Sequence, residues 1–114
     1  MYQLTKKDII AINQHVGETG ALANGSSLDF ALHIVKQRKP WIQELSYIIR
    51  SLLADHAFQD GNKRTALALI ISYCDYHHIE IDKQRIVYAI HRMAKKNITH
   101  LSKIMRLIEH GIIR

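Results

Sequence analysis

The chain has 114 residues, of which 47% are hydrophobic and 23% are charged, and its formal net charge is +6. This length is typical of one domain, so residues 1–114 are expected to form a single domain. Folding at this size buries roughly two-thirds of the surface of the unfolded chain, which excludes intrinsic disorder as the main description. One cysteine, Cys74, excludes an internal disulfide and favours a reducing, cytoplasmic location. The longest apolar run, residues 66–71, is far shorter than the ~20 residues of a spanning helix, so no membrane partner is expected.

The positive charge is concentrated towards the C-terminal side of the sequence. Residues 82–114 carry eight basic and two acidic side chains, whereas residues 1–81 carry eight of each. At helical spacing, Arg92 and Lys96 each project within about 20° of Arg85, and the three form a short basic stripe. This stripe is too short for a nucleic-acid footprint, so no nucleic-acid partner is expected. The excess charge indicates either a docking surface for an acidic partner or an ordinary solvated face.

Apolar residues recur at helical spacing along the chain, and no stretch alternates with a period of two. The predicted fold class is therefore all-α, a single compact bundle of about six helices. Thr5 followed by Asp8 matches a capping box and predicts a first helix that runs to about Val16. Residues 17–26, which contain three glycines, follow as the longest predicted loop.

The middle of the chain is predicted to hold the core helices. Ser27 is expected to cap a short helix over residues 28–36, with Phe30 among its inward-facing residues. Residues 40–56 begin with a proline and present one continuous apolar face, so this helix is expected to be central. The next helix is predicted over residues 62–77, and its expected buried residues are Leu67, Ile70, Ile71 and Cys74.

Two more helices are predicted on the C-terminal side. Asp82 is expected to cap the first of them, which buries Ile86, Ala89, Ile90 and Met93. Thr99 is expected to open the second, and Gly111 follows its end.

The densest chemistry lies in residues 56–65, where a histidine ends one apolar helix and a Gly-Asn-Lys-Arg run opens the next. Free N–H groups at a helix N-terminus bind anions, Gly61 lets a ligand approach the backbone, and Lys63 and Arg64 add positive charge. Asp60 offers a hard oxygen ligand for Mg²⁺, and histidine is a base that titrates near neutral pH. These are the parts that a group transfer from a nucleotide to a hydroxyl requires.

Each residue of this run also has a purely structural interpretation. His56 shares a helical face with the apolar residues before it, which favours a core histidine bonded to a carbonyl group. Phe58 is interpreted as a loop anchor in the core, and Asp-Gly alone is a common turn. Lys63 and Arg64 alone would be surface charges, but a helix dipole disfavours cations in its first turn, which argues for a bound anion.

In its order of residues the run resembles the signature of Fic/Doc proteins. The resemblance rests on His56-Ala-Phe-Gln-Asp-Gly-Asn-Lys-Arg-Thr-Ala66, and the Asn-Lys-Arg-Thr-Ala ending is most similar to the Doc (death-on-curing) branch. The loop over residues 17–26 also resembles the Gly-rich loop after the first helix of Doc-like proteins. The resemblance implies a Fic/Doc-like helical bundle, with ATP as the donor substrate and Mg²⁺ as the cofactor.

The resemblance also implies a role for each matching residue. Fic relatives transfer AMP from ATP to hydroxyl side chains, whereas Doc transfers a phosphoryl group to a threonine of elongation factor Tu. By this resemblance His56 is the catalytic base that deprotonates the target hydroxyl, and Asp60 holds Mg²⁺. The residues that would bind the nucleotide phosphates are Gly61, Asn62, Lys63 and Arg64.

Two departures from the AMP-transferring pattern favour phosphoryl transfer to the protein target. Lys63 stands where that pattern has a second glycine, and Leu67 stands where it has a second arginine. A bulky cation in the loop should change how the triphosphate lies. AMP transfer by the same site is the alternative.

Two further features of the family concern partners. Its self-inhibitory motif, a Ser or Thr four residues before a Glu, does not occur in these residues, so any restraint is expected from a separate antitoxin chain, as in toxin–antitoxin pairs. In the family an extended flap before the central helix pairs with the target by strand addition, and residues 36–40 are the corresponding stretch. A plain linker between helices is the other interpretation of that stretch.

Functions of other classes compete with this interpretation. Arg50 and His56 fit the loose spacing of HEPN-type ribonucleases, in which arginine binds phosphate and histidine moves the proton, but the Gly-Asn-Lys-Arg run is then unexplained. A noncatalytic binding module would use residues 82–114, where no helix is rich in base-reading side chains. A Fic/Doc fold that binds nucleotide without transferring anything is a third alternative.

Overall fold

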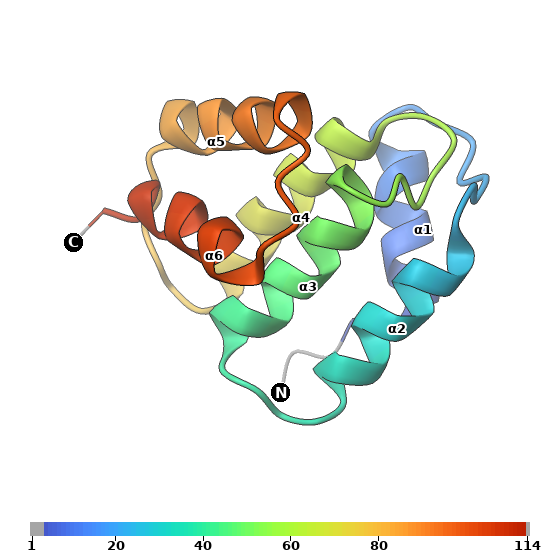
Figure 1. The fold of residues 1–114 in the computed structure, drawn as a ribbon, viewed down its shortest axis with the longest axis horizontal. Coiled ribbons are helices and arrows are strands. Elements are labelled where there is room, and N and C mark those ends of the chain that lie inside the picture. Colours follow the sequence, from blue (N-terminus) through green and yellow to red (C-terminus); the bar gives the residue numbers. More distant parts are fainter. Residues whose placement is uncertain (1–3, 114) are drawn as a thin grey trace.

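Residues 4–113 are described by a computed structural model, and six α-helices account for most of them (Figure 1). The helices are α1 (Lys6–His15), α2 (Gly25–Val35), α3 (Trp41–Leu53), α4 (Asn62–Tyr76), α5 (Lys83–Lys95) and α6 (Leu101–His110). Extended pairing within residues 4–113 is limited to two isolated antiparallel bridges, Leu22 with Phe58 and Ile81 with Ile112. The all-α prediction is confirmed. No helix of this range is long and apolar enough to cross a bilayer.

Local sequence sets the start of two helices as predicted. At α1 the Thr5 hydroxyl accepts from the N–H of Asp8 (3.2 Å), and the Asp8 carboxylate accepts from the N–H of Thr5 (3.0 Å), which completes the capping box. At α5 the Asp82 carboxylate accepts from the N–H groups of Gln84 and Arg85. Such caps satisfy donors that a helix end leaves free, and each contributes about 1 kcal/mol.

The other two predicted caps are wrong. Asn24, not Ser27, caps α2, and its side chain accepts from the N–H of Ser27 (3.3 Å). Ser27 lies in the first turn, where its hydroxyl is hydrogen-bonded to that of Ser51 on α3 (2.8 Å). His100, rather than Thr99, is the residue that precedes α6. In both places several neighbouring polar residues are suitable caps, and the sequence alone does not distinguish between them.

The central helix is α3, as predicted. It packs against α2, α4, α5 and α6 (Figure 1). Its buried apolar residues recur at helical spacing: Leu45, Ile48, Ile49, Leu52 and Leu53. Full burial of such a side chain contributes about 1.5–3 kcal/mol to the stability of the fold. This face of α3 therefore holds the surrounding helices in place.

Three expected core positions are corrected. Phe30 is 54% exposed, because α2 buries other residues and leaves this ring outside, edge-on to Tyr47. Leu67 and Ile71 are only half-buried, whereas α4 buries Leu69 and a tyrosine along with the predicted Ile70 and Cys74. The predicted core residues of α5 are all buried. Residues 36–40 form an exposed turn and linker without a strand.

Candidate active site

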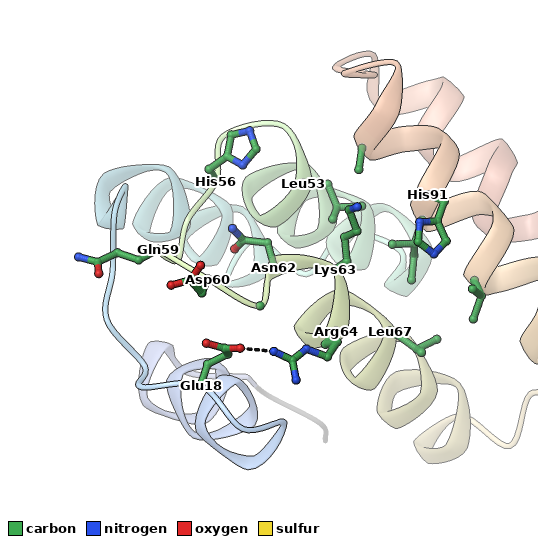
Figure 2. A pocket seen from close by; sticks show the side chains of 14 residues that line it. Glu18, Leu53, His56, Gln59, Asp60, Asn62, Lys63, Arg64, Leu67 and His91 are labelled. Carbon is green, nitrogen blue, oxygen red and sulfur yellow. Dashed lines mark hydrogen bonds and ion pairs between the residues drawn. The ribbon is translucent and has the colours of Figure 1, made fainter.

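A pocket of about 550 Å³ opens where α3 ends and α4 begins (Figure 2). One side of it consists of residues from the connection between these helices and from the first turns of α4. Another side comes from α5, and Glu18 reaches it from the loop after α1. The predicted site residues His56, Asp60, Gly61, Asn62, Lys63 and Arg64 all line this pocket. The fold therefore gathers the whole predicted set at one place.

His56 lies beyond the end of α3 rather than on it. Backbone hydrogen bonds from Asp55 to Arg50 (3.2 Å) and from Ala57 to Ser51 (3.1 Å) wrap the chain around the helix end. Between them His56 has a φ of 50°, in the left-handed region that residues other than glycine rarely adopt. Its side chain is exposed at the pocket, so the alternative of a core histidine is wrong.

The connection that carries His56 is fastened to the loop after α1. Three backbone hydrogen bonds of 2.8 to 3.0 Å join them: Ala23 and Asn24 donate to Ala57, and Gln59 donates to Ala21. Phe58 lies between these bonds and is only 1% exposed, so its prediction as a loop anchor is confirmed. The histidine is thus presented from a fixed segment and not from a free loop.

Asn62 closes the turn that follows Phe58. Its side-chain oxygen accepts from the N–H of Phe58 (3.0 Å), and its side-chain nitrogen donates to the carbonyl of the same residue (2.9 Å). Both polar atoms of the amide are therefore engaged by the backbone. Any contact of Asn62 with an anion would come from its backbone N–H.

The N-terminus of α4 starts at Gly61, whose φ of 79° lies in the left-handed region. A Cβ there would clash with the side chain of Glu18, so this position needs glycine for its backbone and for space. The first backbone bond of the helix runs from Thr65 to Gly61 (2.8 Å), and no side chain of the described residues caps the helix. The amides of the first turn are left for water or an anion.

The two cations of this first turn differ in their contacts. Arg64 forms an ion pair with Glu18 and donates to the carbonyl of Val16 (2.9 Å), which holds the loop after α1 against α4 (Figure 2). Lys63 is exposed, lines the pocket and has no ion pair among residues 4–113. Lys63 is therefore the cation that an incoming anion meets without displacing a carboxylate.

Asn13 is a supporting residue of the site that the sequence analysis did not identify. It is 1% exposed, and its side-chain nitrogen donates to the carbonyl of Asp60 and to the hydroxyl of Thr65, both at 3.0 Å. Its side-chain oxygen accepts from the N–H of Gly20 (2.9 Å). One buried amide therefore joins α1, the loop after it and the start of α4. The available signal was an asparagine one helical turn after the buried Ile9.

Asp60 presents its carboxylate at the exposed rim of the pocket. Within residues 4–113 no three His, Cys, Asp or Glu side chains are gathered as a metal site. Mg²⁺ needs fewer protein ligands, because it uses one or two carboxylates and completes its shell with water and phosphate oxygens. A carboxylate beside an uncapped helix N-terminus fits such an ion together with a bound phosphate.

The far wall of the pocket is largely apolar. It is made by Leu53 at the end of α3, by Leu67 on α4 and by one face of α5, which contributes Val87, Ile90, His91 and Ala94. No local pattern connects the residues of α5 with the motif, because only the packing of α5 against α4 brings them to it. The cationic side and the apolar side together suit a ligand with an anionic and an aromatic part.

Arg50, the partner of His56 in the ribonuclease alternative, lies elsewhere. Its guanidinium stacks over the ring of Tyr47 at 5.0 Å from the centroid. It lines a separate hollow with Ser27 and Asp55 and does not line the pocket of His56. The structure therefore does not bring together the two residues on which that alternative depends.

These features define a class of protein: a helical bundle in which an exposed histidine precedes an uncapped, cationic helix N-terminus, an arrangement suited to moving phosphorus-containing groups. The model of the Fic/DOC family matches residues 3–74, which is more than half of the chain. The chain belongs to the Fic/DOC family, whose members are generally protein-modifying transferases. No curated protein matches the chain. The family match contains every predicted site residue, whereas α5 and α6 lie outside it.

Proposed function

We propose that this protein transfers a phosphoryl group from ATP to a hydroxyl side chain of a protein target, with His56 as the general base. The observation that carries the proposal is that an exposed histidine and the uncapped N-terminus of α4 share one pocket. A base and an anion site next to each other are what such a transfer needs from the protein.

Each side of the pocket has a part in binding ATP. The amides of the first turn of α4 and the free ammonium of Lys63 would hold the phosphates. The apolar wall, to which Leu67 and Ile90 contribute, would receive the adenine ring. A volume of about 550 Å³ lies within the usual range for pockets that bind small molecules.

In the proposed step the target hydroxyl gives its proton to the imidazole of His56, and its oxygen attacks the γ-phosphorus. The bond from that phosphorus to the bridging oxygen breaks, and ADP leaves with the electron pair. The imidazolium then returns its proton to water. Mg²⁺, when bound to the phosphates with Asp60 as its protein ligand, would neutralise the charge on the leaving diphosphate.

Lys63 and Leu67 favour γ-phosphoryl transfer over AMP transfer. Lys63 places a cation in the first turn of α4, beside the pocket, at a position where the pattern of AMP-transferring relatives has glycine. Leu67 gives an apolar contact where those relatives have a second arginine. Both differences would change how the triphosphate is placed. An experiment with labelled ATP distinguishes phosphoryl transfer from AMP transfer.

The test is to incubate the protein with Mg²⁺, elongation factor Tu as the first candidate target, and ATP labelled either at the γ- or at the α-phosphorus. Label on the target from γ-labelled ATP alone is expected. Label from α-labelled ATP would overturn phosphoryl transfer in favour of AMP transfer. If neither donor labels this target or the proteins of a cell extract, the transferase proposal fails.

A pair of histidine variants controls the experiment. His56→Ala is expected to reduce the rate of labelling by at least about a hundred-fold, because it removes the general base. His33→Ala changes another exposed histidine, on α2 and away from the pocket, and is expected to label normally. Equal labelling by the two variants would show that His56 is not the base.

A further inference from the structure

A second concave surface lies on the other side of α5, between α5 and α6. It consists of two adjoining hollows, the larger of about 710 Å³, which share Tyr88, Leu107 and His110. We call this continuous surface the α5–α6 groove. It lies entirely outside the segment that matches the family.

The charge of the α5–α6 groove is gathered at one end. Its larger hollow is lined by Arg92 from α5, by Lys96 directly after that helix, and by Lys103 and Arg106 from α6. No Asp or Glu lines this hollow among the described residues. The four cations repel one another, and an anionic ligand would relieve that repulsion.

The middle of the groove is apolar. Tyr88 is 64% exposed, which is unusual for a large ring, and Leu107 and Ile98 form a half-buried floor beside it. An exposed aromatic side chain in a concave site is a common anchor for a partner. An occupant therefore needs an apolar side chain next to its negative charges.

The residues at the opposite end of the groove disfavour a nucleic acid as its occupant. The smaller hollow is lined by Asp82, which is paired with Arg85 at 3.5 Å. A phosphate backbone that followed the groove would meet this carboxylate, and Tyr88 is the one Phe, Trp or Tyr among the residues that line the groove. A short acidic segment, by contrast, can place its charges at one end and its apolar side chain in the middle.

From this arrangement we propose that the α5–α6 groove binds an acidic segment of a partner protein, which carries an apolar anchor beside its Asp or Glu residues. The negative charges pair with Lys103, Arg106 and their neighbours, and the anchor packs on Tyr88. The proposal does not rest on the transferase activity, because the groove and the pocket of His56 share no lining residue.

The test measures binding of a fluorescein-labelled peptide of glutamates and leucines at helical spacing, by fluorescence anisotropy and without ATP. Binding that weakens with added salt is expected. Lys103→Glu is expected to raise the Kd by about five- to ten-fold, because one attraction becomes a repulsion. Tyr88→Ala is expected to weaken binding without changing its dependence on salt.

Lys7→Glu is the matched control. Lys7 lies in the first turn of α1, as Lys103 does in the first turn of α6, and both are exposed, so the two variants change the net charge equally. A glutamate in a first turn agrees with the helix dipole, so both variants should fold. Equal effects of the two variants, no binding of the peptide, or tighter binding of an oligouridylate that displaces the peptide would each overturn the proposal.

Discussion

Glu18 and Arg64 are 46 residues apart in the chain and form an ion pair at the rim of the pocket. The pair joins the loop after α1 to the first turn of α4, where the proposed phosphates would bind (Figure 2). Arg64 is 59% exposed and Glu18 20%, so the carboxylate is the more buried partner. A phosphate in the pocket therefore has a carboxylate as its competitor for Arg64.

Glu18→Gln is expected to tighten the binding of ATP. The neutral amide keeps the shape of the side chain and competes less strongly for Arg64, because it carries no charge. Exposed ion pairs are worth up to about 1 kcal/mol, so the Kd should fall by at most about five-fold. Titration calorimetry at low salt would measure it, with Glu80→Gln, an exposed carboxylate outside the pocket, as the control. Weaker binding would instead show that Glu18 takes part in holding the nucleotide.

Asn13→Ala is expected to lower the free energy of unfolding by about 2–4 kcal/mol, because it leaves three buried or half-buried partners without their hydrogen bonds. Urea denaturation followed by circular dichroism would measure the loss. Gln84→Ala, a change of an exposed amide on α5, should alter stability by less than about 0.5 kcal/mol. A loss no larger than that of the control would mean that Asn13 does not hold the site together.

Gly61→Ala and Gly17→Ala separate backbone strain from lack of space. Both glycines have a positive φ, so an alanine costs about 1–2 kcal/mol at either position. At Gly17 the nearest atom to the new Cβ, on Arg64, is 3.7 Å away, whereas at Gly61 the Cβ meets Glu18. Gly61→Ala should therefore be the less stable variant in urea denaturation. Adding Glu18→Ala should recover the difference, and a failure to recover would place the clash elsewhere.

His56→Gly is expected to be more stable than His56→Ala, and both variants are expected to lose transfer. Glycine adopts the φ of 50° without the cost that a side chain incurs, so the gain relative to His56→Ala should be about 1 kcal/mol. Thermal unfolding of the two variants would measure it. Lower stability of the glycine variant would show that the left-handed backbone carries no strain at this position.

Glu44→Gln is expected to stabilise the protein at neutral pH and not at acid pH. Partial burial raises the pKa of Glu44 above its ordinary value of 4.5, so the folded state holds the proton more tightly than the unfolded state. The ionised carboxylate therefore costs stability once the pH has risen through the raised pKa, and both states are protonated below the ordinary value. Urea midpoints of the two proteins should converge as the pH falls. A constant difference would assign the effect to another cause.

The sequence predicted those parts of the fold that depend on neighbouring residues. Thr5 and Asp82 each have their partners within three residues, and both caps were predicted correctly. Asn24 caps α2 in place of Ser27, whose hydroxyl is hydrogen-bonded to Ser51 on another helix. Phe30 lies outside because the phase of α2 against α3 depends on packing that no local pattern states.

The same division applies to the site. His56, Asp60 and Arg64 lie within nine consecutive residues, so a single local motif contains all three. Asn13 and Glu18 reach the motif only through contacts between α1, its following loop and α4, and the wall from α5 arrives from beyond the family match. The motif therefore predicted which residues share the pocket, and tertiary packing supplies its support and its shape.

Neighbouring residues of α5 belong to different surfaces, since Val87 and His91 line the pocket of His56 whereas Tyr88 and Arg92 line the α5–α6 groove. Inserting or deleting one residue within α5 would rotate everything after it by about 100° and exchange what the two surfaces present. Single substitutions on either face change one surface alone. The length of this helix is thus more tightly constrained than the identity of any one of its exposed side chains.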